Sequence, residues 1–199
     1  MRESPNKDAR MPELIRRTSL LEVKGQIEEV EVCVVHEDGR EHITTDPVWV
    51  YGDSIAVLAY DPTAKTVLLV KQLRVAPYIM EEEIILEACA GGIEISDLSI
   101  EEACKREAQE ELGCQLTNLQ KIANVFINPA RLAERAHLFL AEYTSGDFNV
   151  ESRNLDDDED IEVVELSFEE LRSLYDNQEI RCPRLFMLTQ ALLLKSIGI

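Results

Sequence analysis

Residues 99–113 constrain this chain most, because they predict a helix that carries carboxylates on its own apolar face. Ser99 and Glu102 have the spacing of a capping box, and Gly113 is typical of the position just after a helix end. One apolar stripe follows the i, i+4 spacing: Ile100, Cys104, Ala108 and Leu112. The pattern therefore predicts a helix over 99–112 that packs against a hydrophobic core.

Two glutamates interrupt this stripe. On a helical wheel Glu111 falls about 20° from Cys104 and Glu107 about 60°, whereas Glu110 lies about 120° away. An inward-facing carboxylate is costly unless it is paired or binds a metal, and two of them at i and i+4 repel each other. A divalent cation would reverse that repulsion. The alternative is a solvated acidic face tied by an Arg106–Glu110 ion pair.

The residues before the helix favour the metal interpretation. Ala90, Gly91 and Gly92 follow an expected short strand over 84–88 and are expected to form a loop that leads to the helix. Glycines there would let a backbone carbonyl approach an ion or a phosphate closely. Oxygen ligands favour Mg²⁺ or Mn²⁺ over Zn²⁺. A tight turn between strand and helix is the alternative.

Residues 92–114 resemble the Nudix box, G-x5-E-x7-R-E-U-x-E-E-x-G-U, and match its fixed positions with one exception. Leu98 stands where the box has its first Glu, which usually supports the box arginine, here Arg106. Asp97 is adjacent and could substitute for that Glu. Cys114 replaces the usual aliphatic residue, which is a minor change.

The resemblance implies a site for Mg²⁺, with Mn²⁺ as a substitute, built from carboxylates and a backbone carbonyl. The ligands it implies are Glu107, Glu111, Glu110 and the backbone at Ala90 or Gly91. Glu111 and Glu110 are also expected to serve catalysis. Three further residues are expected to hold the shape of the motif: Gly92, Arg106 and Gly113.

From about Val57 to its end, the chain is similar to the ADP-ribose and nucleoside-diphosphate-sugar pyrophosphatases of this superfamily, and it is closest to bacterial GDP-mannose hydrolases. The segment 70–78 is similar to their strand with a phosphate- or base-contacting arginine, and 87–91 to their E-x-x-A-G. Residues 128–131 replace their usual S-P-G-G. The substrate-binding residues implied are Arg74, Gln72, Glu87, Arg131, Glu134 and Arg135.

The acidic run at 156–160 is similar to the acidic catalytic loop of the same group. The resemblance implies Glu159 as general base or extra metal ligand, with Asp157 as the second candidate. A calcium loop of the EF-hand type is excluded, because Ile161 stands where glycine is needed and Ser167 where the bidentate Glu belongs. From the residues alone, a solvated loop is the alternative.

Charge is concentrated in these two regions. Of the formal net charge of −19, residues 81–111 and 151–170 together carry −18. A surface of this sign repels phosphate backbones and anionic lipids, so neither nucleic-acid nor membrane partners are expected. The polar N-terminus shows no secretory signal, and five cysteines without a C-x-x-C pair are typical of reduced thiols, so the expected location is cytoplasmic.

The order of the expected elements predicts an α+β fold with a mixed sheet flanked by helices. Strands are expected over 29–34, 54–60, 66–72, 84–88, 122–127, 136–142 and 161–166, and further helices over 168–175 and 184–196. The resemblance specifies a Nudix fold, an α/β/α sandwich over residues 46–199. Residues 1–45 form an N-terminal β-hairpin segment that either extends the sheet or packs on another subunit.

The expected function is Mg²⁺-dependent hydrolysis of the pyrophosphate bond of a small nucleoside-diphosphate sugar, such as ADP-ribose or GDP-mannose. The products would be a nucleoside monophosphate and a sugar phosphate. Because the family often dimerises through its N-terminal segment, a homodimer is expected. The alternative is a non-catalytic nucleotide-sugar sensor on the same fold, suggested by Leu98 and by the altered loop after Asn128.

Overall fold

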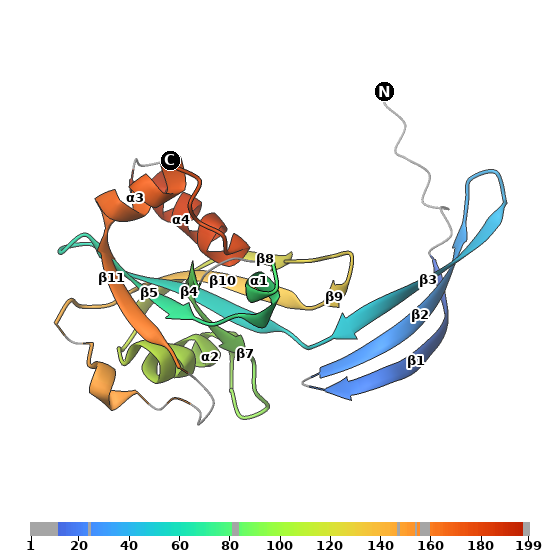
Figure 1. Ribbon diagram of the computed structural model, residues 1–199, viewed down its shortest axis with the longest axis horizontal. Coiled ribbons are helices and arrows are strands. Elements are labelled where there is room, and N and C mark those ends of the chain that lie inside the picture. Colours follow the sequence, from blue (N-terminus) through green and yellow to red (C-terminus); the bar gives the residue numbers. More distant parts are fainter. Residues whose placement is uncertain are drawn as a thin grey trace. The chain divides into compact units, whose positions relative to one another are not determined.

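A computed structural model describes residues 12–23, 25–80, 84–146, 148–153, 155 and 160–196 (Figure 1). The chain divides into two compact units. The first unit comprises Met1–Gly52 and Asn128–Glu134, and the second comprises Asp53–Ile127 and Arg135–Ile199. Within the described residues no helix is both long and apolar enough to cross a membrane.

The first unit is a four-stranded sheet in the order β1-β2-β3-β9. Its strands are β1 (Glu13–Val23), β2 (Gly25–Val35), β3 (Glu41–Val50) and the short β9 (Leu132–Ala133). The first three pair antiparallel, and β9 runs parallel to β3. The strand expected over 29–34 is confirmed as part of β2, and Asp38-Gly39 turns the chain into β3 with a positive φ at Gly39. The strand β1 was not expected.

The second unit contains the main sheet, in the order β11-β5-β4-β10-β8. These strands are β4 (Ser54–Asp61), β5 (Thr66–Gln72), β8 (Thr117–Phe126), β10 (Arg135–Glu142) and β11 (Glu162–Ser167). The strands β4 and β10 pair in parallel, and the other pairs are antiparallel. Two short strands branch from this sheet: β6 (Ile85–Glu87) pairs with β5, and β7 (Cys89–Gly92) pairs with β4. The mixed sheet confirms the α+β prediction.

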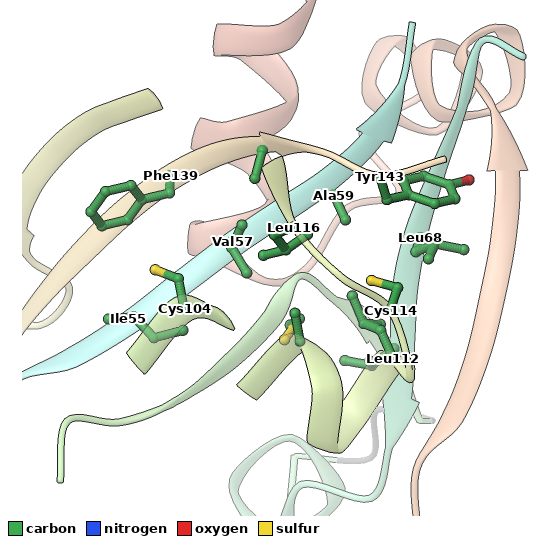
Figure 2. Close-up of a cluster of buried hydrophobic side chains, with 14 of the residues drawn as sticks. Ile55, Val57, Ala59, Leu68, Cys104, Leu112, Cys114, Leu116, Phe139 and Tyr143 are labelled. Carbon is green, nitrogen blue, oxygen red and sulfur yellow. The ribbon is translucent and has the colours of Figure 1, made fainter. Parts of the chain in front are cut away.

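Helices cover both faces of this sheet, which confirms the predicted α/β/α arrangement (Figure 1). On one face lies α2 (Ile100–Glu107), continued by the π-helical turn η1 (Ala108–Leu112). On the other lie α3 (Phe168–Asp176) and α4 (Pro183–Ser196). Figure 2 shows the core under α2, where Val57 and Phe139 of the sheet meet Cys104 and Leu112.

Two segments differ from expectation. Residues 90–92, expected as a loop, form strand β7 because their backbone pairs with Ser54–Ala56 of β4. The strand that resembles the arginine-bearing strand of the relatives ends at Gln72, and residues 75–78 form the short helix α1 (Val75–Tyr78). Pro77 fits there because the first turn of a helix needs no amide donor.

Candidate active site

The helix that carries the candidate site is fixed at both ends. The Ser99 hydroxyl accepts a hydrogen bond from the Glu102 amide at 3.1 Å, as the predicted cap requires. The Glu102 carboxylate contacts Lys105 at 2.8 Å, so the reciprocal half of the predicted capping box is replaced by an ion pair. Gly113 ends the helix with φ +70°, and a Cβ there would overlap the Asn149 carbonyl. Glycine is therefore required at this position.

The last turn of this helix is a π-helix, not the uniform α-helix that was expected. The amides of Gly113 and Cys114 both point back to the Ala108 carbonyl, which closes a turn wider than an α-helical one. Such insertions occur frequently at functional sites because they re-aim side chains. Here the wider turn leaves Glu111 only 4% exposed, next to the fully buried Leu112.

Glu111 lies against strand β7. Its Oε2 accepts a hydrogen bond from the Ala90 amide at 3.1 Å. The adjacent Cys89 thiol is fully buried, and this burial raises its pKa, with the carboxylates of Glu111 and Glu107 adding to the effect. A negatively charged cluster therefore sits beside β7, and the Cys89 thiol stays protonated next to it.

Glu107 lies against the same strand, one helical turn earlier. A Cβ at Gly91 would overlap the Glu107 carboxylate, so the missing side chain of Gly91 provides the space that this carboxylate occupies. Glu110 is more exposed than either of the other two glutamates. Two carboxylates at i and i+4 thus converge on the backbone of Ala90 and Gly91.

This donor set fits a hard divalent cation. It consists of carboxylate oxygens beside a strand backbone, and Mg²⁺ is usually held by one or two carboxylates with water and substrate phosphates. Over the described ranges no three His, Cys, Asp or Glu side chains cluster closely enough to form a complete metal site. In such a site, water and substrate phosphates would supply the remaining ligands.

Arg106 organises the outer side of the cluster. Its Nη1 donates to Glu107 Oε1 and to Glu110 Oε2, each at 2.9 Å, so the i, i+4 ion pair of the alternative interpretation is present beside the contact to Glu107. Its Nε and Nη2 donate to the two oxygens of Asp97 at 3.0 and 3.1 Å. Its Nη2 also donates to the Gly92 carbonyl at 2.9 Å.

Asp97 fills the role left by Leu98. The Leu98 side chain is 94% exposed, whereas the hydrogen bonds from Arg106 hold the pKa of the largely buried Asp97 carboxyl below its ordinary value. Asp97 also accepts a hydrogen bond from the Glu94 amide at 2.8 Å, which closes the loop before the helix. The one departure from the box pattern is therefore compensated by the neighbouring residue.

Arg74 and Glu87, both expected to bind substrate, contact each other. Arg74 Nε donates to Glu87 Oε2 at 2.6 Å. Gln72 is the last residue of β5 and pairs with Ile85 of β6. Gln72 therefore lies where β5 ends beside the start of β6, and Glu87 lies at the other end of β6, opposite Val70.

The remaining candidates for substrate binding fall in different units. In the first unit, Arg131 Nη1 pairs with Asp46 at 2.7 Å, and Glu134 is buried. In the second unit, the guanidinium of Arg135 lies over the exposed ring of Phe126, 5.5 Å from its centroid.

Glu159 and Asp157 lie outside the described residues, but residues that flank them are anchored to the end of the box helix. Arg153 Nη1 donates to the Ile161 carbonyl at 2.7 Å and to the Glu111 carbonyl at 3.4 Å. The Asn149 amide donates to the Gly113 carbonyl at 2.9 Å. Sequence reasoning missed this role of Arg153, although it is the only basic residue within 151–170.

Comparison with known proteins places the chain in a family. Residues 50–184 match the NUDIX domain. The chain is 36% identical over 141 residues to the GDP-mannose pyrophosphatase of Pectobacterium atrosepticum, covering 70% of this chain and 72% of that protein. It is 30% identical over 187 residues to the GDP-mannose pyrophosphatase of Cronobacter sakazakii, covering 93% and 96%.

Solved structures show the same fold. A crystal structure of an ADP compounds hydrolase has a TM-score of 0.71 and 15% sequence identity, covering 97% of this chain and 99% of that one. The domain match over residues 50–184 confirms the family predicted from residues 92–114. The chain belongs to the NUDIX family.

Proposed function

We propose that this enzyme hydrolyses the pyrophosphate bond of a nucleoside-diphosphate sugar, with GDP-mannose and ADP-ribose as the first candidates. The products are a nucleoside monophosphate and a sugar phosphate. The observation that carries the proposal is the convergence of Glu107 and Glu111 on the backbone of Ala90 and Gly91. The names of the relatives support it: GDP-mannose pyrophosphatases by sequence and an ADP compounds hydrolase by fold.

The proposed cofactor is Mg²⁺, with Mn²⁺ as a substitute. Glu107 and Glu111 would hold it, with Glu110 as a further or water-mediated ligand and a carbonyl at Ala90 or Gly91. When bound, such an ion neutralises pyrophosphate charge and lowers the pKa of a bound water. Excess chelator is expected to abolish hydrolysis and added Mg²⁺ or Mn²⁺ to restore it, and activity that persists in EDTA would contradict the metal requirement.

Other residues of the chain would position the metal ligands, bind a phosphate and accept a proton. Arg106 holds Glu107 and Glu110 in place through Nη1. Arg74 holds a phosphate of the substrate, because a guanidinium suits phosphate oxygens. Glu159, or Asp157 as second candidate, accepts the proton of the attacking water. The anchoring of residues 153 and 161 near the Glu111 carbonyl supports this last assignment.

The alternative, a non-catalytic nucleotide-sugar sensor, was suggested by Leu98 and by the altered loop after Asn128, and the first of these two observations no longer supports it. Asp97 makes the ion pair with Arg106 that Leu98 cannot make. A sensor would bind the ligand without releasing a phosphomonoester. An assay that couples hydrolysis to phosphatase and measures free phosphate distinguishes the two, and a panel of nucleoside-diphosphate sugars with Mg²⁺ identifies the substrate.

We also propose a cytoplasmic homodimer whose only ligands are small molecules, without nucleic-acid or membrane partners. The five cysteines are all free, which suits a reducing compartment. In the first unit, β1 exposes several large apolar side chains, namely Leu14, Ile15, Leu20 and Leu21. Such exposed apolar residues mark interaction surfaces. Light scattering is expected to give the mass of two chains, and a mass near one chain would contradict the dimer.

A further inference from the structure

The Arg74–Glu87 pair has an unusual arrangement for a surface ion pair. Glu87 ends strand β6 opposite Val70 of β5, and its side chain is only 11% exposed. Arg74 follows β5 and precedes α1, and its side chain is 40% exposed. A carboxylate this buried needs a charged partner, and breaking such a pair from one side is costly. The ion pair therefore fixes the guanidinium of Arg74 at its Nε atom.

The contact uses only one of the donor groups of Arg74. Its Nε bonds to Glu87 Oε2 at 2.6 Å, and no other described residue accepts from its two Nη groups. A guanidinium held through Nε presents both Nη groups together, in the planar geometry that binds two oxygens of one phosphate. Within the described part of the chain, the contact to Glu87 thus orients Arg74 and leaves its two Nη groups available for a phosphate.

Other arginines of the second unit use their donors differently. All three guanidinium nitrogens of Arg106 donate hydrogen bonds, and the acceptors include Asp97, Glu107 and Glu110. Arg153 donates to backbone carbonyls. Arg74 is therefore better suited than either to hold a substrate anion.

The position of the pair along the chain suits the proposed site. Glu87 precedes Ala90 by three residues, and the Ala90 amide binds the Glu111 carboxylate. Three residues of extended chain span about 10 Å. The Glu87 Cα thus lies within about 10 Å of the Ala90 Cα, and the Ala90 amide binds the Glu111 carboxylate.

We infer that Glu87 is a positioning residue, which holds Arg74 so that its Nη groups grip a phosphate of the substrate. This inference rests on the proposed function and assigns Glu87 an indirect role, where the resemblance implied direct substrate binding. If Glu87 acts only through Arg74, its removal matters only while Arg74 is present.

A double-mutant cycle tests this dependence. The variants are Glu87→Gln, Arg74→Ala and the double variant, with kcat and KM measured for GDP-mannose and Mg²⁺. Glu87→Gln is expected to raise KM about 10-fold with a smaller change in kcat, as loss of a charge-assisted hydrogen bond predicts. The double variant is expected to match Arg74→Ala. Multiplying effects would show that Glu87 acts on the substrate independently, and would overturn the inference.

Two controls separate positioning from folding and from the proposed activity. Asp176→Asn removes a carboxylate from the surface ion pair with Arg172 on α3, and is expected to leave KM unchanged. Glu87→Asp, which keeps the charge, is expected to restore part of the lost affinity, and no recovery at an unchanged melting temperature would count against positioning. If the wild type does not hydrolyse GDP-mannose, the proposed function fails. The same cycle is then carried out with the dissociation constant of GDP-mannose, measured in the presence of Mg²⁺, in place of KM. Absence of binding would then overturn the inference too.

Discussion

The Asp97 carboxylate and the Arg106 guanidinium form a two-point ion pair, with Nε–Oδ1 and Nη2–Oδ2 distances of 3.0 and 3.1 Å. Through its third nitrogen, Nη1, the same guanidinium reaches Glu107 and Glu110. Asp97 therefore acts on the candidate metal ligands from a distance, by fixing the arginine between them. In a site of this kind such indirect contacts matter nearly as much as the ligands themselves.

Asp97→Ala is expected to lower kcat/KM by about 10- to 100-fold, the usual cost of losing a residue that orients metal ligands. The change frees Arg106 on one side and lets Glu107 and Glu110 move. Steady-state hydrolysis at saturating Mg²⁺ measures the loss, and a titration with Mg²⁺ shows a weaker apparent affinity for the ion.

The matched rescue is the double variant Asp97→Ala, Leu98→Glu, which moves the carboxylate to the position that the Nudix box normally uses. It is expected to recover most of the lost activity. The single variant Leu98→Glu is expected to change little, because Asp97 already holds Arg106. Failure of the rescue, with both proteins folded, would show that Asp97 does more than support Arg106.

Gly91→Ala is expected to reduce activity much more than Gly92→Ala. At Gly91 the new methyl group would overlap the Glu107 carboxylate, whereas at Gly92 a Cβ meets nothing within 4 Å. Overpacking of this kind costs about 1–3 kcal/mol, and here it would displace a candidate ligand. Equal losses of activity in the two variants, both with melting temperatures close to that of the wild type, would contradict the close approach of Glu107 to Gly91.

Arg153→Gln is expected to lower kcat more than it raises KM. Its guanidinium links the carbonyls of Ile161 and Glu111, and hydrogen bonds from a charged donor contribute about 1.5–3 kcal/mol. Arg181→Gln is a suitable control, because Arg181 also donates to a backbone carbonyl, that of Gln178 in an exposed turn. If both variants keep the wild-type kcat, the anchoring at Arg153 does not serve catalysis.

Asp61→Asn is expected to remove part of the acid sensitivity of folding. Hydrogen bonds from the amides of Ala64, Ser145 and Thr63 hold the pKa of Asp61 below 3.8, its ordinary value. A lowered folded-state pKa stabilises the protein above the unfolded-state pKa, and this stability is lost as pH falls through the folded-state pKa. The wild type should therefore exceed the variant in free energy of unfolding at neutral pH.

The measurement for Asp61 is the difference in free energy of unfolding between wild type and variant, followed from pH 7 downward by chemical denaturation. The difference is expected to stay level at neutral pH and to shrink below about pH 4, the ordinary range of an aspartate. A difference that is the same at all pH values would show that the charge of Asp61 contributes nothing.

Most of the second unit could be predicted from sequence, because its elements follow local rules. Strands β4 and β5 are continuous apolar runs, and the ends of α2 and α3 have capping residues that are visible in the chain. Strand β1 could not be predicted, since its eleven residues neither alternate cleanly between apolar and polar nor form one apolar run. Its pairing with β2 depends on a partner strand and not on its own pattern.

The site was less predictable than the fold. Helical spacing placed Glu111 on the apolar side, but it could not predict the π-helical turn, which is defined by the backbone hydrogen bonds from Gly113 and Cys114 to the Ala108 carbonyl. Strand β7 was mistaken for a loop because glycines rarely indicate a strand, and only its pairing with β4 defines it. The ion pair between Arg74 and Glu87 joins residues thirteen positions apart, and no spacing rule predicts it.

Glu107 and Glu111 are proposed to form a metal-dependent hydrolytic site, and the turnover of Glu111→Gln on GDP-mannose with Mg²⁺ tests whether they do. Gln keeps the size of the side chain but removes the charge that would bind the ion. At an unchanged melting temperature, turnover is expected to fall by orders of magnitude. Activity within a few-fold of the wild type would show that the helix carrying Glu111 is not the active site.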